Sequence, residues 1–210
     1  MKSDQGYQRA YCKNAFFTGT DIATKLWVGD YQNGDSFQDL AQESAGIRRL
    51  AVLRADIDNL GQAFVSGFES EKYGQRYVTL SRTATFSRKL ALFFKRHVNT
   101  LLENGNTFLV DGDDPARKAT IVYSGGDDMF VIGAWDDILG FAADLYDTLS
   151  RYSQGMLTIS AGIGIYPEKY PIAAMARQTG ALEDAAKAHP GKNAITLFQE
   201  DNTYGWEEFI

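Results

Sequence analysis

Residues 119–133, ATIVYSGGDDMFVIG, restrict the possible fold more than any other stretch of the chain. Two apolar runs flank a Gly-Gly-Asp-Asp tetrapeptide, and this pattern predicts a β-hairpin. We expect Gly125 and Gly126 to supply the positive φ that a tight hairpin turn requires. The turn does not explain Asp127 and Asp128. Two carboxylates about 4 Å apart repel each other by roughly 4 kcal/mol at an effective dielectric constant near 20, and a bound cation would relieve that repulsion.

A second acidic stretch ends an apolar run upstream. Residues 49–58 read RLAVLRADID, which predicts a buried strand over about residues 48–57. Side chains alternate along a strand, so Asp56 and Asp58 are expected on the same side. With Asp127 and Asp128, the two stretches offer up to four carboxylates to one hard cation. The alternative is a solvated hairpin tip, since Gly and Asp are common turn residues.

The remaining apolar spacings predict the element order β-α-β-β-α-β-α-β. This order contains the split β-α-β arrangement of the α+β ferredoxin-like fold, with one added helix and strand. In that fold the first strand lies beside the strand that follows the hairpin tip and runs antiparallel to it, which would bring Asp56 to the GGDD tip. We expect a strand-and-loop extension at residues 1–47, the main domain at 48–200 and the start of a further region at 201–210. The predicted helices cover residues 81–103, a segment opening at 136–137, and 171–189, and the later strands cover 157–166 and 194–198.

The composition excludes several classes of protein. The net charge of −6 and the pI near 5.0 argue against a protein that coats nucleic acid, because such proteins carry a basic field. Cys12 is the only cysteine, so the chain has neither a disulfide framework nor a cysteine zinc site. No apolar run approaches the roughly 20 residues of a membrane span. These features predict a cytoplasmic protein.

Four motifs, in order, resemble one family. They are GIRRLAVLRADIDNLGQAF, the helix SRTATFSRKLALFFKRHVNTLL, YSGGDD and HPGKNAITLF. The chain is similar to the palm shared by polymerases, diguanylate cyclases and class III nucleotidyl cyclases, and within that group to the large subunit of type III-A (Csm) CRISPR interference complexes. The resemblance implies an enzyme that converts ATP to cyclic oligoadenylates in antiviral defence, when an RNA-guided complex of Csm subunits meets target RNA.

Nucleotidyl transfer of this kind uses Mg²⁺ or Mn²⁺ to activate a 3′-hydroxyl and to neutralise the transferred phosphoryl group. We expect Asp56, Asp127 and Asp128 as metal ligands, with the carbonyl of Ile57 as a fourth and with Asp127 and Asp128 as the catalytic pair. Backbone N–H groups at a helix start suit phosphate oxygens, which favours residues 58–61 for the triphosphate. The expected ATP-binding residues are Asp58, Asn59, Leu60, Gly61, Ser124, Gly125, Gly126, Lys187 and Lys192.

Several of these assignments have alternatives. Asp58 could instead hold the turn, and Ser124 could simply finish its strand. Lys187 and Lys192 match a phosphate-binding cyclase motif in AKAHPGKN, but a lysine at a helix C-terminus also satisfies the helix dipole. A diguanylate cyclase and a catalytically lapsed scaffold remain the other functions. Family members usually carry a nuclease-type HD domain and a first palm before this region, so we expect a fragment or one piece of a split subunit, with the first palm as a partner.

Overall fold

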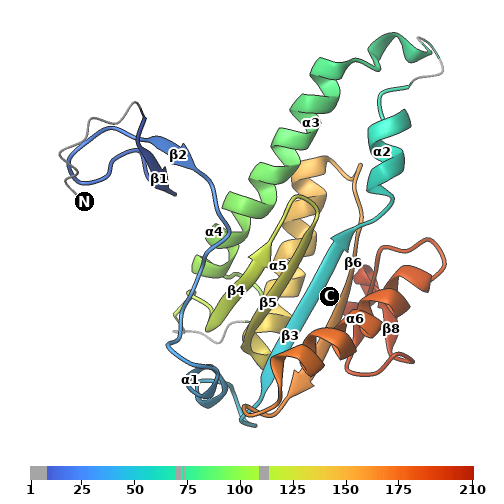
Figure 1. Cartoon of the computed structure of the whole chain (residues 1–210). Coiled ribbons are helices and arrows are strands. Elements are labelled where there is room, and N and C mark those ends of the chain that lie inside the picture. The colour runs from blue at the N-terminus through green and yellow to red at the C-terminus, as the bar shows by residue number, and fades with distance from the viewer. Residues whose placement is uncertain (1–8, 70–71, 73, 109–113) are drawn as a thin grey trace.

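The protein is built on a six-stranded mixed sheet (Figure 1) with strand order β4-β5-β3-β6-β7-β8. The structure, a computed structural model, describes residues 9–69, 72, 74–108 and 114–210. The strands of the sheet are β3 (Leu50–Ile57), β4 (Ala119–Ser124), β5 (Asp128–Ala134), β6 (Ile159–Tyr166), β7 (Ala194–Leu197) and β8 (Thr203–Gly205). The expected order of strands and helices from β3 to β7 is confirmed.

Helices cover both faces of the sheet. One face packs against α5 (Trp135–Ser153) and a long helix made of α3 (Leu80–Leu92), a π-helical turn (Phe93–His97) and α4 (Val98–Glu103). The other face packs against α1 (Phe37–Gln42) and α6 (Ile172–Ala188). The remaining elements are β1 (Tyr11–Lys13), β2 (Thr24–Leu26), α2 (Leu60–Ser66), a 3₁₀ turn (Gln75–Tyr77) and α7 (Trp206–Phe209).

Strand β3 is central and buried on both sides. Its residues alternate between the two cores, so Leu53 packs towards α3 and α5 while Val52 packs towards α1 and α6. It runs antiparallel to both neighbours, β5 and β6. Asp56 therefore faces Asp128 on β5, as expected, and Ser160 on β6.

Parts of the segments outside residues 48–200 pair with the main sheet, whereas β1 and β2 form a separate two-stranded sheet. Strand β8 pairs antiparallel with β7, and Trp206 is 1% exposed within the larger core. Residues 203–209 thus add a strand and a helix to the same sheet and core. At the other edge, the Tyr31 carbonyl accepts a hydrogen bond from the Ile121 N–H, and Gln32 forms a bridge with Thr120 on β4.

The hairpin turn differs from the expectation for Gly-Gly. Neither Gly125 nor Gly126 has a φ in the left-handed region, so the prediction that they supply positive φ is wrong. The Gly125 N–H donates to the Asp128 carbonyl at 2.8 Å, which places Gly126 and Asp127 at the centre of the turn. A Cβ on Gly125 would lie 2.7 Å from Oδ1 of Asp128. A larger residue at position 125 would therefore have to displace the Asp128 carboxylate.

In the part of the chain that the structure describes, no helix is both long enough and apolar enough to cross a membrane.

Candidate functional site

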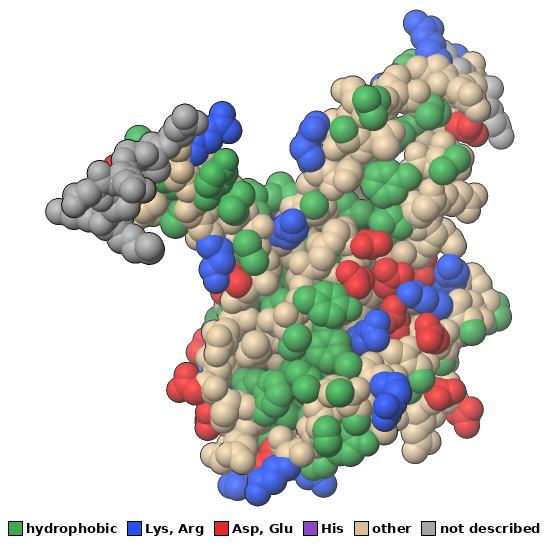
Figure 2. Space-filling view, in the orientation of Figure 1, with side chains coloured by type: hydrophobic (Ala, Val, Ile, Leu, Met, Phe, Trp, Pro, Cys, Tyr) green, Lys and Arg blue, Asp and Glu red, His purple; other side chains and the backbone are tan. Residues whose placement is uncertain are grey.

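Three carboxylates meet at one end of the sheet. Asp56, one residue before the end of β3, lies directly opposite Asp128, which opens β5. The Ile57 N–H donates to the Asp127 carbonyl at 3.1 Å and ties the hairpin tip to the end of β3. Figure 2 shows acidic side chains gathered beside lysine and arginine side chains near this end of β3. The structure thus brings together Asp56, Asp127 and Asp128, the carboxylates that the sequence predicts as metal ligands.

The negative charge of the three carboxylates is only partly balanced by nearby cations. Burial raises the pKa of Asp127, and the neighbouring carboxylates of Asp56 and Asp128 raise it further, against an opposing effect of Lys187. Such a shift indicates a charged form that lacks sufficient stabilisation. A cation bound to the cluster would stabilise the charged form of Asp127.

Lys187 lies at the edge of this cluster. Its Nζ is 2.8 Å from Oδ2 of Asp56 and 2.6 Å from Oε1 of Glu183. Burial alone would lower the pKa of Lys187, but the hydrogen bonds to Asp56 and Glu183 outweigh burial and raise it. Glu183 is 5% exposed, and its Oε2 is 3.0 Å from Nε of Arg54. The sequence predicts Lys187 as a phosphate-binding residue but does not identify Glu183 or Arg54.

Lys192 reaches the start of α2 from the turn after α6. Its Nζ donates to Oδ1 of Asn59 at 2.8 Å. Asn59 and Lys192 both have left-handed backbones, with φ of 53° and 55°. Lysine rarely adopts this conformation, so the surrounding turn must hold it in place. The two segments expected to bind the triphosphate, near residue 59 and at Lys192, are therefore in contact.

Asp58 does not face the site. Its carboxylate accepts hydrogen bonds from Thr158 Oγ1 at 2.8 Å, Ser160 Oγ at 2.7 Å and the Asn193 N–H at 3.0 Å. Its own N–H donates to the Thr158 carbonyl at 2.9 Å. Asp58 is 5% exposed and fully engaged, so we correct its assignment from ATP binding to holding the turn. Nearby, a Cβ on Gly61 would meet only open space, which leaves room for a ligand.

Ser124 is also engaged within the protein. Its Oγ donates to the Phe94 carbonyl at 2.7 Å, in the π-helical turn. A β-bulge between Ile121 and Tyr123 shifts the register of β4 just before this contact. The geometry favours the alternative in which Ser124 anchors its strand. At the tip, a Cβ on Gly126 would have no atom within 4 Å, so this position is open to a ligand.

The donor chemistry at the tip fits a hard divalent cation, because carboxylate and carbonyl oxygens are its preferred ligands. Among the described residues, however, no group of three or more His, Cys, Asp or Glu side chains has metal-binding geometry. Asp56 is turned towards Lys187 instead. Metal binding through Oδ2 of Asp56 would therefore require that oxygen to exchange its ammonium partner for the metal ion.

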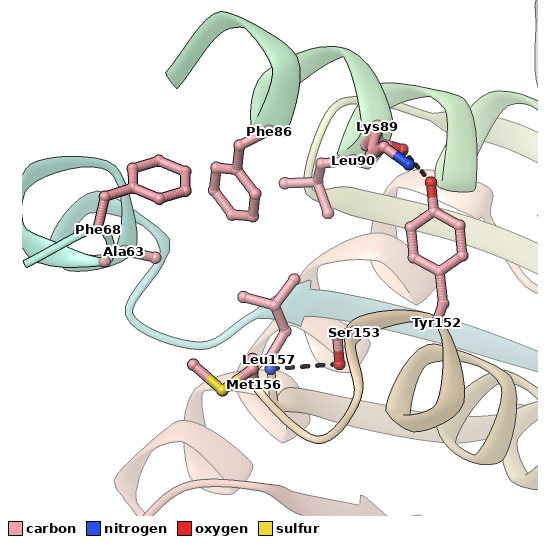
Figure 3. A pocket seen from close by; sticks show the side chains of 10 residues that line it. Ala63, Phe68, Phe86, Lys89, Leu90, Tyr152, Ser153, Met156 and Leu157 are labelled. Carbon is pink, nitrogen blue, oxygen red and sulfur yellow. Dashed lines mark hydrogen bonds between the residues drawn. The ribbon is translucent and has the colours of Figure 1, made fainter. Parts of the chain in front are cut away.

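An apolar cavity of about 270 Å³ lies between α2, α3 and the end of α5 (Figure 3). Phe86 and Leu90 project into it from α3, and Leu157 lines the opposite side. The Tyr152 hydroxyl donates to the Lys89 carbonyl at 2.9 Å, so this polar group is already paired. None of Asp56, Asp127 or Asp128 lines the cavity. It is separate from the carboxylate cluster.

This sheet, with carboxylates at the end of β3 and at the β4–β5 tip, is a palm domain. The chain belongs to the Cas10/Cmr2 family, whose second palm domain matches residues 49–196. The resemblance seen in the sequence motifs is confirmed.

Curated relatives are Cas10/Csm1 proteins of subtype III-A, named CRISPR system single-strand-specific deoxyribonucleases. The protein of Mycobacterium tuberculosis is 52% identical over 205 residues, which cover 97% of this chain and 25% of the relative. The protein of Streptococcus thermophilus is 43% identical over 212 residues, which cover 99% of this chain and 26% of the relative. The chain thus spans about a quarter of the length of these relatives.

Solved structures of Csm1 have the same palm fold. A Csm1–Csm4 cassette in complex with one ATP has a TM-score of 0.80 and 29% identity. The match covers 95% of this chain and 30% of the matched chain. The cassette in complex with cA4 has a TM-score of 0.80 and 28% identity, and the match again covers 95% of this chain and 30% of the Csm1 chain. These structures confirm the α+β palm fold.

Proposed function

We propose that this chain is the ATP-binding palm of a type III-A CRISPR large subunit, and that it carries out metal-dependent 3′-5′ nucleotidyl transfer leading to cyclic oligoadenylates. One observation carries the proposal: Asp56, Asp127 and Asp128 converge with Lys187 at one end of the sheet. The similarity to Csm1 structures that contain ATP or cA4 supports the choice of nucleotide.

Each residue of the site has a proposed role. Asp56, Asp127, Asp128 and the Ile57 carbonyl would hold Mg²⁺ or Mn²⁺, which activates the 3′-hydroxyl and neutralises charge on the transferred phosphoryl group. Lys187 and Lys192 would bind the triphosphate through charge-assisted hydrogen bonds. The open surroundings of Gly61 and Gly126 would let the nucleotide approach the backbone.

The proposed partners follow from the family. We propose that the chain acts in the cytoplasm beside a first palm domain and other Csm subunits, with guide and target RNA bound in the assembly. The Csm1 structures that resemble it were solved with Csm4. The proposal does not extend to the deoxyribonuclease activity in the relatives' name.

Calorimetry of nucleotide binding tests the proposal. The unmodified chain should bind ATP in the presence of Mn²⁺, and D127A/D128A should abolish that binding because two of the metal-binding carboxylates are lost. The double variant should stay folded, with equal or higher stability without metal, since like-charge repulsion is relieved. E207A/E208A, which removes two adjacent exposed carboxylates from α7, is the matched control and should bind normally.

The same titrations separate the alternatives. Unchanged Mn-ATP affinity in D127A/D128A would contradict the site assignment. Tighter binding of GTP than of ATP would indicate a diguanylate-cyclase-like function. Binding of neither nucleotide would indicate a scaffold palm.

A further inference from the structure

Glu183 is a buried carboxylate that the proposed ligand set does not include. It lies on α6 with 5% of its surface exposed. Its two oxygens contact different cations, with Oε1 at 2.6 Å from Lys187 and Oε2 at 3.0 Å from Arg54. Removing a carboxylate from water is costly unless it is paired, and here both oxygens are paired. The two ion pairs offset the cost of burying the negative charge of Glu183.

The chain makes room for this network at two glycines. A Cβ on Gly162 of β6 would lie 2.4 Å from the Glu183 nitrogen, so only glycine lets α6 pack this close to the sheet. A Cβ on Gly180 would lie 2.8 Å from Nη1 of Arg54. Arg54 and Asp56 are two residues apart on β3 and therefore on the same face. Helix α6 and strand β3 together hold two cations beside the carboxylate cluster.

Lys187 has two carboxylate partners of different kinds. Asp56 belongs to the proposed metal site and is partly exposed, with 24% of its side chain accessible. Glu183 lies one helical turn before Lys187 and has only 7% of its side chain accessible. Of these two carboxylates, Asp56 is therefore the one more accessible to a ligand. If Oδ2 of Asp56 exchanged Lys187 for a metal ion, Glu183 would be the partner that remains.

We propose that Glu183 is a positioning residue, which keeps Lys187 at the edge of the site when Asp56 turns to the metal ion and so directs the ammonium group to the triphosphate. This inference rests on the proposed function. Without the Glu183 charge, Lys187 would pair with Asp56 alone and compete with the metal ion for it. Glu183 would thus support both metal binding and phosphate binding without touching either.

The test is calorimetry of Mn-ATP and of adenosine on E183Q, which keeps the side-chain shape but removes the charge. We expect Mn-ATP affinity to fall about tenfold, the scale of one charge-assisted contact, with adenosine affinity unchanged. D184N is the matched control, because Asp184 is the exposed neighbour on the same helix and carries the same charge. Its affinities for both ligands should equal those of the unmodified chain. E183D should restore part of the affinity.

A Lys187→Ala background separates positioning from other roles. If Glu183 acts through Lys187, E183Q should cause no further loss of Mn-ATP affinity in that background. Additive losses would overturn the inference, as would unchanged Mn-ATP affinity in E183Q or an equal loss for adenosine. If E183Q fails to fold, the same comparison is made with E183D. An unmodified chain that does not bind Mn-ATP would instead contradict the proposed function itself.

Discussion

Asp127 shows at the level of one residue how the site differs from an ordinary hairpin tip. Burial and the charges of Asp56 and Asp128 raise its pKa. The folded protein therefore holds the Asp127 proton more tightly than the unfolded chain does. The charged form destabilises the fold, and this destabilisation is present at neutral pH.

The metal-free protein should show this as a pH dependence. As pH rises from the ordinary Asp value of 3.8 through the raised pKa of Asp127, the folded state loses its extra proton and its stability falls relative to D127N. Thermal melting of the two proteins over this interval gives the difference. D201N, which removes an exposed carboxylate outside the cluster, should follow the pH profile of the unmodified chain. If D127N and the unmodified chain show parallel profiles, Asp127 is not under the expected repulsion.

The sequence predicts some of these residues and misses others, for physical reasons. The apolar patterns predict the element order, and the strand order of the corresponding fold places Asp56, Asp127 and Asp128 together. Asp58 follows the last residue of β3, so alternation no longer decides what its carboxylate contacts, and its three partners come from distant residues. The position of Glu183 beside the site depends on how closely α6 packs on β6, which the sequence pattern does not reveal. The spacing of four between Glu183 and Lys187 is the signal that could have identified it.

At the level of elements, a buried arginine joins the segment before β4 to α5. The Arg117 side chain is 0% exposed, with Nη2 at 2.6 Å from Asp144 Oδ2 and Nη1 at 3.4 Å from Asp137 Oδ1. Nη2 also donates to the Thr107 carbonyl at 2.7 Å. Gly140, on α5, leaves the space that the guanidinium occupies.

G140A should therefore destabilise the protein by about 2–3 kcal/mol, the scale of overpacking in a well-filled core. The added Cβ would lie 2.3 Å from Nη1 of Arg117 and 2.5 Å from the Thr107 carbonyl oxygen. Denaturant unfolding measures the change. G61A is the matched control, since Gly61 is also helical but has nothing within 4 Å of its Cβ position. Equal stabilities for both variants would show that Arg117 and its neighbours can move to accommodate the added methyl group at little cost in free energy.

The elements most accurately predicted are those with a strong local pattern, such as α5 and α6. The π-helical turn is not visible in the apolar spacing. Within this turn, the Phe94 carbonyl accepts a tertiary hydrogen bond from Ser124, 30 positions away, which the sequence does not reveal. Strand β8 is only three residues long and pairs through its backbone, so its side chains give little signal.

For the whole molecule, the number of nucleotide sites would limit the proposed synthesis. The described residues provide one carboxylate cluster and one pair of lysines, Lys187 and Lys192, which suffice for one nucleotide. Chain growth also needs an acceptor 3′-hydroxyl held in line with the α-phosphate of the donor, and such placement can supply roughly 7–11 kcal/mol of the barrier. If the chain carries out the proposed synthesis, the acceptor lies on another surface, which we propose is the first palm.

We therefore expect the purified chain to bind ATP but to make little or no cyclic oligoadenylate with Mg²⁺ or Mn²⁺. Adding a first-palm fragment, or using the full subunit, should restore synthesis. Chromatography of the reaction products over a series of protein concentrations gives the measurement. Robust synthesis by the chain at low concentration would contradict this expectation. A rate that rises with the square of concentration would mean that two copies pair and replace the first palm.

The backbone pairing of residues 31–33 with β4 affects how the domain can be isolated. Tyr31 and Asn33 hydrogen-bond to Ile121 and Ala119 along the outer side of β4. A piece cut at residue 48 would leave that strand edge bare, and an unpaired edge is a template for intermolecular strand addition. A cut at residue 200 would likewise expose β7 and remove Trp206 from the core. A fragment that avoids aggregation therefore has to begin before Tyr31 and extend beyond Trp206.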